Sequence, residues 1–228
     1  MQQALRSARG NLLERVELLA ILLFILAALA LLLVPGPSVL YIVSQSIAQG
    51  RRGGLLSVVG IDTATLTHAG AAAFGLSVIL LSSALVFDAV KFAGAAYLIL
   101  LGIRTLVSKQ RVNYSVADVG VSRKGPLRLF AQGYVVNLLN PKTALFFYAF
   151  LPQFVVPSQG GVIEQTFTLG LVFVALALFT DSMYALTTST AGRWFLRRGG
   201  RIFTHQKYVT GTTYIALGLI AATASSGT

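Results

Sequence analysis

Two aspartates are the residues of this sequence best suited to chemistry, because each stands alone in a long apolar segment. Asp62 is the only acid within residues 53–87, and Asp181 is the only acid within residues 166–192. A charged group at the centre of a bilayer costs roughly 2.5–3.5 kcal/mol or more, so it normally pairs or performs a function. Each aspartate is predicted to bind an ammonium group or carry a proton, and the alternative is a permanent salt bridge with Lys142.

Two proline-containing breaks interrupt the apolar segments that precede these acids. The first is Pro35-Gly36-Pro37, and the second is Asn140-Pro141. Proline removes an amide donor and drives the preceding residue out of the helical region, but it is well suited to begin a helix. A new half-helix is therefore predicted to begin at Pro37 and Ser38, where its free amides could hold a carboxylate. A simpler interpretation of either proline is an ordinary helix kink.

The second break also supplies polar side chains. Asn140 precedes Pro141, and Asn137 lies one turn earlier on the same side of the helix. Helical spacing places Thr65 beside Asp62 and Tyr184 beside Asp181. The predicted substrate-binding residues are Pro35, Gly36, Pro37, Ser38, Asp62, Thr65, Asn137, Asn140, Pro141, Lys142, Asp181 and Tyr184. Of these, Asp62 and Asp181 are the predicted proton-coupling residues, and no metal, cofactor or catalytic residue is predicted.

These features share one depth in the predicted membrane. At about 1.5 Å per residue, Pro37, Asp62, Asn140 and Asp181 each lie roughly 15–20 Å from a basic cluster. The hydrocarbon core is about 30 Å thick, so all four fall near its middle. His68 lies about 240° around the helix from Asp62, so it is interpreted as a hydrogen-bonded packing residue and not as a proton relay.

The elements that must position these residues are membrane-spanning helices. Hydrophobic residues make up 55% of the sequence and charged residues 11%, whereas a soluble domain carries about 25% charged residues. We expect an all-α integral membrane protein whose six helices cover, approximately, residues 17–49 broken near 35, 54–80, 85–107, 127–157 broken near 141, 166–191 and 207–225. The predicted organisation is a basic extension (1–17), a three-helix repeat (18–107), a cytoplasmic loop (108–126) and a second three-helix repeat (127–228).

The two halves also share a motif in their last helices. Gly94, Tyr97 and Gly102 recur as Gly211, Tyr214 and Gly218. Together with the two breaks and the two aspartates, this order predicts a repeat. An odd number of spans in each half requires the second copy to be inverted, as in many transporters.

The net charge of +11 follows from the predicted topology. The basic residues cluster at residues 51–52, 104–128 and 193–207, which fall on one face of a six-span protein and are therefore cytoplasmic by the positive-inside rule. Both termini are then periplasmic or extracellular, and nucleic-acid binding is not predicted. The sequence has no cysteine, and it lacks phosphate-binding and nucleophile motifs, so an enzyme is not predicted.

At these motifs the sequence resembles the LysE/RhtB amino-acid exporter family. The resemblance covers about residues 18–224. It is carried by Pro35-Gly36-Pro37, Gly50-Arg51-Arg52-Gly53-Gly54-Leu55, Gly60, Gly75-Leu76, Gly94-Ala95-Ala96-Tyr97-Leu98, Leu101-Gly102, Gly133, Asn137, Asn140-Pro141-Lys142 and Leu151-Pro152-Gln153-Phe154. It implies a six-span exporter in a bacterial inner membrane that acts on amino acids or close derivatives such as lysine, homoserine, threonine or leucine.

The leading hypothesis is proton-coupled efflux of a small zwitterion, with its carboxylate at the Pro37 half-helix and its ammonium group near Asp62 and Asp181. The expected partners are an amino-acid substrate, protons, the lipid bilayer and a second copy in a homo-oligomer. Two alternatives are efflux of a metal or other cation, and a membrane assembly protein that transports nothing.

Overall fold

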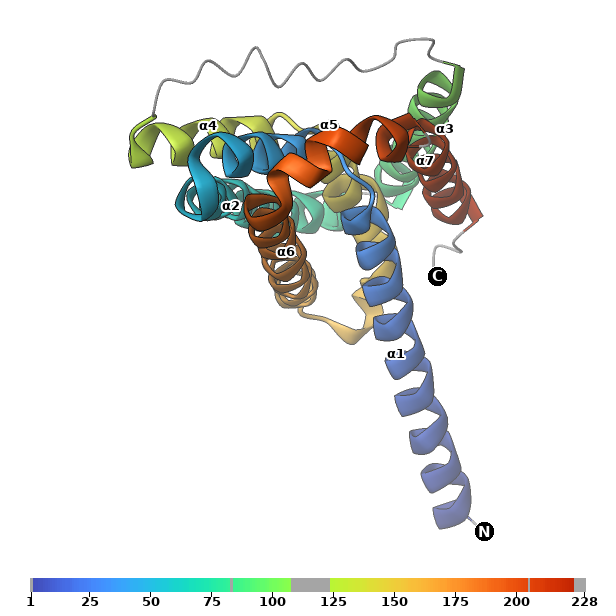
Figure 1. Ribbon diagram of the computed structural model, residues 1–228. Helices are drawn as coiled ribbons and strands as arrows, with labels where there is room; N and C mark the ends of the chain where they lie inside the picture. The colour runs from blue at the N-terminus through green and yellow to red at the C-terminus, as the bar shows by residue number, and fades with distance from the viewer. Residues whose placement is uncertain (1, 83, 108–123, 205, 224–228) are drawn as a thin grey trace.

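The computed structural model describes residues 2–82, 84–107, 124–204 and 206–223, and this part of the chain is helical with short connections (Figure 1). The long helices are α1 (Gln2–Leu33), α2 (Pro37–Ser82), α3 (Ala84–Val107), α4 (Pro126–Leu138), α6 (Val162–Thr204) and α7 (Gln206–Thr223). The central part of the predicted cytoplasmic loop, residues 108–123, lies outside the described residues. The side chains of the predicted basic extension (1–17) and of the third basic cluster (193–207) lie outside them as well.

The first apolar segment is interrupted at residues 34–36 and again at Gly50. Helix α1 ends at Leu33 and α2 begins at Pro37, with a bend of 52° between them. Within α2, Gly50 has φ 70° and ψ −165°, a conformation that is essentially restricted to glycine. We therefore describe α2 as two helices, α2a (residues 37–49) and α2b (residues 51–82). Because the chain stays helical up to this single residue, it differs from the loop that the sequence suggested between residues 49 and 54.

The fourth segment is more irregular than the long broken helix expected from the sequence. Helix α4 ends at Leu138, and α5 (Pro141–Leu145) begins after residues 139 and 140. The chain continues into a π-helix (η2, Phe146–Phe150) and two 3-10 turns (η3, Leu151–Phe154; η4, Pro157–Gln159). The Asn140 side chain caps α5 by accepting a hydrogen bond from the Lys142 amide at 3.1 Å.

Helix α6 also differs from its predicted extent. It continues to Thr204, beyond the predicted end at residue 191, and α1 extends back to Gln2. In the described part of the chain, Val162–Thr190 is long and apolar enough to cross a membrane. The bent pair Leu18–Leu33 and Pro37–Gly75 passes the same test together, and α3 has a shorter apolar stretch, Phe92–Val107. Six membrane spans therefore remain a prediction.

Small residues set the packing around α2b. A Cβ atom at Gly54 would meet Ala185 of α6, and one at Gly170 of α6 would meet Ala69, so α2b and α6 are antiparallel. On the other side of α2b, a Cβ at Gly60 would collide with the Phe130 backbone of α4, and one at Gly133 with the Ser57 carbonyl. Gly60 and Gly133 are needed because a side chain there would strike the backbone of the neighbouring helix, whereas Gly54 and Gly170 leave room for neighbouring side chains.

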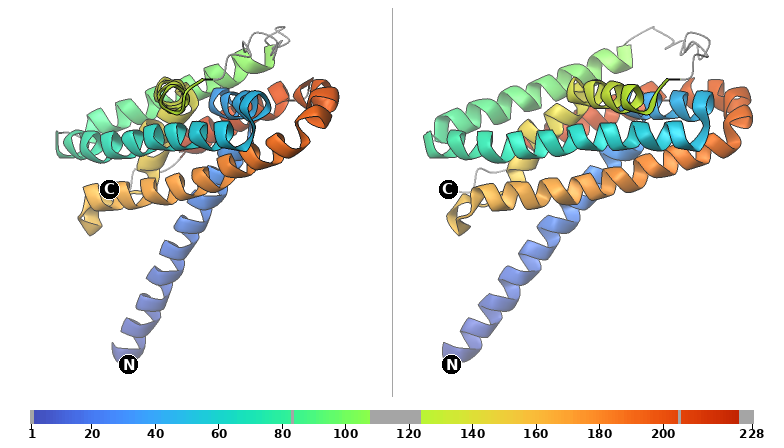
Figure 2. Two further views of the ribbon diagram at one scale, coloured as in Figure 1. Left: turned by 60° about the vertical axis from the view of Figure 1, so that its left-hand side comes forward. Right: turned by 90° about the vertical axis from the view of Figure 1, so that its left-hand side faces the viewer.

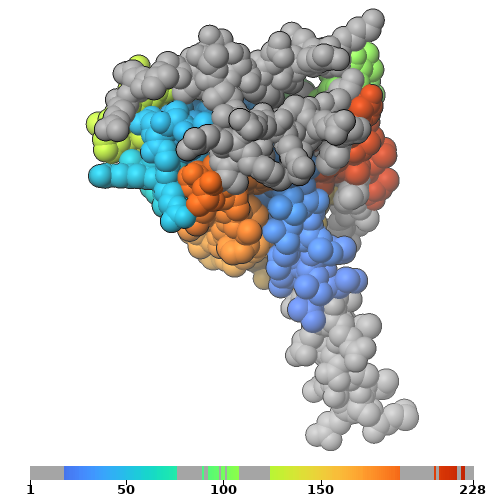
Figure 3. All heavy atoms as spheres, viewed as in Figure 1, coloured from blue at the N-terminus to red at the C-terminus, as the bar shows by residue number. Residues whose placement is uncertain are grey.

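Helices α3 and α7 form a second closely packed pair (Figure 1). A Cβ at Gly102 would meet the Gly211 carbonyl, and one at Gly218 would meet the Ala95 carbonyl, so the two glycine motifs face one another. Helix α1, at 32 residues about 48 Å long, projects away from the other helices at its N-terminal end (Figures 1 and 2). Its second half packs beside α6, as Figure 3 shows on one face.

The main apolar core is a group of phenylalanines from α1, η2 and α6, which we call the aromatic cluster. The Phe146 and Phe173 rings lie 4.4 Å apart between centroids, and the Phe24 and Phe146 rings 5.7 Å apart. Its buried members are Phe24, Phe146, Phe147, Phe150 and Phe173, with Phe154 packed against them.

Candidate functional site

A small buried cavity lies where the two helix breaks meet. Its volume is about 30 Å³, room for roughly two water molecules. The cavity is lined by Leu31, Leu32, Gly36, Ser38, Val39, Ile61, Thr65, Asn137, Asn140, Lys142, Thr143, Phe173, Ala177 and Asp181. It therefore combines apolar walls with hydroxyl, amide, ammonium and carboxyl groups from α1, α2, α4, α5 and α6.

Asn137 is the centre of the hydrogen bonds around this cavity. Its Oδ1 accepts from the Ser38 hydroxyl at 2.8 Å and from the Thr143 hydroxyl at 2.9 Å. Its Nδ2 donates to the Ile61 carbonyl at 2.9 Å and to Thr65 Oγ1 at 2.8 Å. One buried amide thus joins both half-helices of α2 to the two sides of the second break.

Asn140 extends this network to the first break. Its Nδ2 donates to Ser38 Oγ at 2.8 Å, while its Oδ1 caps α5. Ser38 lies in the first turn of α2a, which begins after the Pro35-Gly36 break. The two breaks are therefore joined directly, although they are about a hundred residues apart in the sequence.

Lys142 joins the breaks a second time. Its Nζ donates to the Val34 carbonyl at 2.5 Å and not to a carboxylate. Because α1 ends at Leu33, the last carbonyls of that helix lack the usual helical donor, and the lysine supplies one. A Cβ atom at Gly36 would lie 3.3 Å from Lys142 Cδ, so glycine at this position leaves room for the lysine stem.

Asp181 supplies the negative charge of the cavity. It projects from α6 and is 4% exposed. Asp181 and Lys142 thus place opposite charges in the wall of one buried cavity, where their attraction is stronger than in water. A small molecule carrying both a carboxylate and an ammonium group would find a counter-charge for each.

Asp62 is buried but does not line this cavity. Neither of its carboxylate oxygens has a hydrogen-bond partner among the described residues. The antiparallel contacts of Gly54 with Ala185 and of Ala69 with Gly170 place Asp62 opposite residue 177, one turn from Asp181. Asp62 therefore lies at the contact between α2b and α6, outside the cavity that Asp181 lines.

His68 contacts the second break from outside the cavity. Its Nε2 lies 3.4 Å from the Asn137 carbonyl oxygen, and its Nδ1 lies 3.4 Å from the Tyr148 hydroxyl. In a continuing helix the amide of residue 141 would bond to the Asn137 carbonyl, but residue 141 is a proline and has no N–H. This oxygen accepts instead from the Asn140 amide at 3.0 Å, and His68 Nε2 is a second, longer contact. Only an N–H can donate to a carbonyl, so Nε2 carries the proton and Nδ1 accepts from Tyr148. This histidine is hydrogen-bonded, as the sequence interpretation had it.

Seven of the twelve predicted binding residues line the cavity: Gly36, Ser38, Thr65, Asn137, Asn140, Lys142 and Asp181. The remaining five do not. Pro35, Pro37 and Pro141 shape the breaks, Asp62 lies outside the cavity, and the Tyr184 hydroxyl donates to the Leu33 carbonyl at 3.0 Å.

Sequence reasoning missed Thr143 and the apolar lining residues. Thr143 lies six residues after Asn137 and reaches it only because the chain turns between α4 and α5. The local sequence predicts a break at Asn140-Pro141 but not the direction of this turn. The apolar residues resemble any other residues of a membrane helix. Within the described part of the chain, no three His, Cys, Asp or Glu residues gather as metal ligands would.

The long apolar helices and a cavity with charged and polar walls between two helix breaks are typical of helical membrane proteins. The family model described as the LysE type translocator matches residues 29–225, so the chain belongs to this family. The family inferred from the sequence motifs is thereby confirmed.

Individual relatives match along most of their length. The homoserine/homoserine lactone efflux protein of Salmonella typhimurium is 29% identical over 201 residues, covering 88% of this chain and 95% of the relative. An uncharacterized membrane protein of Vibrio cholerae is 27% identical over 205 residues, covering 90% and 97%. A membrane protein of Bacillus subtilis is 28% identical over 183 residues, covering 77% and 86%. No solved structure matches this chain.

Proposed function

We propose that this protein is a secondary active exporter that moves an amino acid or a close derivative out of the bacterial cytoplasm, coupled to the proton gradient. Its family membership and the efflux function named for the Salmonella relative support export of a small metabolite. The observation that carries the proposal is the presence of both Lys142 and Asp181 in the wall of one cavity between two helix breaks.

The cavity chemistry suits a zwitterion. The substrate carboxylate is proposed to lie near Lys142 and the start of α2a, where the first amides of a helix favour an anion. The ammonium group is proposed to lie near Asp181, with the Asn137 and Asn140 amides orienting the rest of the molecule. Either charge alone would leave one buried ion without a partner, which favours a substrate that carries both.

The two aspartates are proposed to have different roles, Asp181 in binding the substrate and Asp62 in carrying the proton. Asp181 faces the cavity and would bind the ammonium group, while Asp62 lies one turn away with both oxygens unpartnered among the described residues. A charge buried without a partner is expensive, so Asp62 is the carboxyl group best suited to hold a transported proton. Arrival of a proton at one carboxyl group also relieves its repulsion of the other, which links proton binding to substrate binding.

We also propose that six spans form two inverted three-helix repeats with the basic loops in the cytoplasm and both termini outside. Three features support this arrangement: the two joined breaks, the antiparallel contact of α2b with α6, and the antiparallel contact of α3 with α7. An internal two-fold axis brings each element of one repeat against its counterpart in the other. The exposed Arg51, Arg52 and Arg128 lie near one end of the α2–α4 pair, as the positive-inside rule requires.

Reconstitution in liposomes tests the function. Liposomes that contain the purified protein are loaded with radiolabelled homoserine, threonine, leucine or lysine. Efflux of the label is then followed with and without an imposed pH gradient. We expect gradient-dependent transport of at least one of them, and loss of it in Asp181→Asn. Glu164→Gln is the matched control, because Glu164 is an exposed acid at the start of the same helix. Equal transport by wild type and Asp181→Asn, or movement of metal ions alone, would refute the proposal.

A further inference from the structure

A row of polar side chains leads from the cavity to one end of the molecule, along the contact between α2a and α4. The Tyr41 hydroxyl donates to the Leu129 carbonyl at 3.1 Å and lies 3.4 Å from Gln132 Oε1. The Lys124 ammonium donates to the same Gln132 oxygen at 2.9 Å, and its backbone amide donates to Gln49 Oε1 at 3.1 Å. We call Tyr41, Gln49, Lys124 and Gln132 the polar seam.

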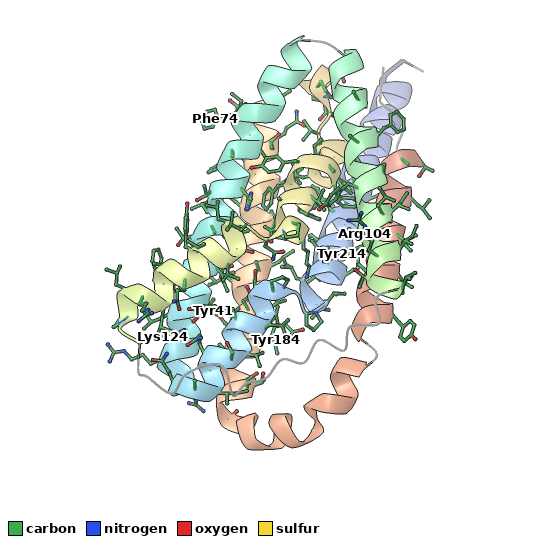
Figure 4. The ribbon with its side chains drawn as sticks, turned by 90° about the horizontal axis from the view of Figure 1, so that it is seen from above. Tyr41, Phe74, Arg104, Lys124, Tyr184 and Tyr214 are labelled. Atoms are coloured by element: carbon green, nitrogen blue, oxygen red, sulfur yellow. The ribbon has the colours of Figure 1, made fainter. Side chains whose placement is uncertain are left out.

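The polar seam continues the hydrogen bonds of the cavity. Ser38, Tyr41, Gln45 and Gln49 follow spacings of three and four residues, so they share one face of α2a. At the inner end of this face, Ser38 bonds to Asn137 of α4, and at its outer end Gln49 bonds to the chain just before α4. Figure 4 shows Tyr41 and Lys124 where α2a lies beside the start of α4.

Helix α2a has backbone breaks at both of its ends. The chain is non-helical at residues 34–36 before it and at Gly50 after it. A Cβ atom at Gly50 would meet nothing within 4 Å, so the space beside this residue is open. A 13-residue helix between two such points can rotate as a rigid body, because a few backbone angles at each end absorb the change.

Helix α4, by contrast, is held firmly by α2b. The backbone contacts at Gly60 and Gly133 leave no space for side-chain rearrangement between these two helices. The contact of α4 with α2a is made through long polar side chains whose hydrogen bonds water can replace. Of the two contacts that α4 makes with α2, the one with α2a is therefore the easier to open.

The cavity also requires an opening. Its volume of about 30 Å³ is too small for an amino acid, and its lining residues other than Leu32 are buried. We propose that α2a swings away from α4 about residues 34–36 and Gly50, and that the opened polar seam is the route by which a small zwitterion reaches the cavity from the end bearing Arg51, Arg52 and Arg128. The identity of the solute and the assignment of this end to the cytoplasm rest on the proposed function.

Thiol labelling tests the route without knowledge of the substrate, because the natural chain has no cysteine. Thr143→Cys places one thiol in the cavity wall, and Ala28→Cys places a matched thiol in the apolar core. With a small charged thiol reagent, we expect Thr143→Cys to react at least about tenfold faster from the face bearing Arg51 than from the opposite face. Ala28→Cys is expected to stay unreactive from both faces. Equal labelling of Thr143→Cys from both faces, or none from the Arg51 face, would overturn the route.

A reversible cross-link tests the motion. Tyr41→Cys with Gln132→Cys joins α2a to α4 when treated with a cleavable two-headed thiol reagent, and Thr67→Cys with Tyr134→Cys joins α2b to α4 as the matched control. The control pair is suitable because the Thr67 and Tyr134 hydroxyls lie 3.2 Å apart. We expect the first link to stop export and its cleavage to restore export, whereas the control link leaves export unchanged.

These experiments separate the route from the proposed function. Full export by the linked Tyr41 and Gln132 pair would overturn the motion. One-sided labelling of Thr143→Cys in a protein that exports no amino acid would uphold the route and refute amino-acid export.

Discussion

The two sides of the central cavity are closed by different kinds of contact. On the side of α2a and α4, the polar seam closes it with hydrogen bonds between long side chains. On the other side, Leu31, Phe173 and Ala177 belong both to the cavity wall and to the main apolar core, which continues into the aromatic cluster. Separating the seam exposes groups that water can solvate, whereas separating the aromatic rings exposes apolar surface and loses close packing.

This difference shows how one chain can be both stable and mobile. A rigid apolar side supplies most of the packing energy and holds α1, η2 and α6 together. The polar side contributes little net energy per hydrogen bond, so it can open and close at small cost. Among the residues that the structure describes, the smaller apolar cluster beside α2a has four buried members, Ile42, Val58, Ile61 and Ala185, which is consistent with a weaker hold on that helix.

The largest expected effect is on the aromatic cluster. Phe146 contacts the rings of Phe24, Phe150 and Phe173, and it is 2% exposed. Replacement by alanine is expected to destabilise the protein by about 3–5 kcal/mol through lost burial and a residual cavity. Thermal unfolding of the detergent-solubilised protein measures this, with Phe74→Ala as the control because Phe74 is 68% exposed. Equal melting temperatures for the two variants would contradict the assignment of the rigid side.

The second-largest effect is expected when the Asn137 side-chain amide, which lines the cavity, is removed. Asn137→Ala removes five hydrogen bonds and leaves Ser38 and Thr143 without their acceptor, which is expected to cost about 1–3 kcal/mol and to abolish export. Gln165→Ala is the control, because Gln165 makes three hydrogen bonds to Val156 and Gly160 outside the cavity. Export per folded molecule should stay near the wild-type value in Gln165→Ala and be lost in Asn137→Ala. Wild-type export by Asn137→Ala would exclude this amide from the site.

The local sequence predicted the breaks but not what satisfies them. Prolines 35, 37 and 141 act on their own backbone, so the ends of α1 and α4 follow from the sequence alone. The contact of Lys142 with the Val34 carbonyl joins residues more than a hundred positions apart. The sequence interpretation had offered, as an alternative, a salt bridge of this lysine with Asp62 or Asp181. The sequence did not predict that Gly50 alone would separate two helices, because a glycine beside two arginines is equally typical of a loop.

Burial of the two aspartates illustrates the same limit. Their isolation in apolar segments predicted that both would be buried, and both are. Helical periodicity could not determine that Asp181 faces the cavity while Asp62 lies outside it, because this depends on how α2b packs against α6. The proposed division of labour between the two carboxyl groups therefore became visible only with the packing.

A smaller effect is expected at His68, which touches the site through the Asn137 backbone. His68→Leu removes one of the two donors to that carbonyl and leaves only the Asn140 amide. About 1 kcal/mol lost in positioning Asn137 should raise the apparent KM for the exported solute about fivefold. His68→Gln keeps an N–H donor and should restore most of the affinity. Transport kinetics at fixed pH provide the measurement. A His68→Leu variant with unchanged KM and a lower maximal rate would show that the histidine does not position this amide.

The smallest effect is expected from removing one hydroxyl group at either of the two contacts of α4, the one with α2a or the one with α2b. Tyr41→Phe removes the hydroxyl that bonds across the polar seam, and Tyr134→Phe removes one that lies 3.2 Å from Thr67 across the contact with α2b. Losing about 1 kcal/mol from the closed seam should increase its open population, and thus the labelling rate of Thr143→Cys, about fivefold. Tyr134→Phe should leave that rate unchanged, because the backbone contacts at Gly60 and Gly133 hold α4 on α2b without it. If the two phenylalanine variants label equally, the seam is no easier to open than the contact between α4 and α2b.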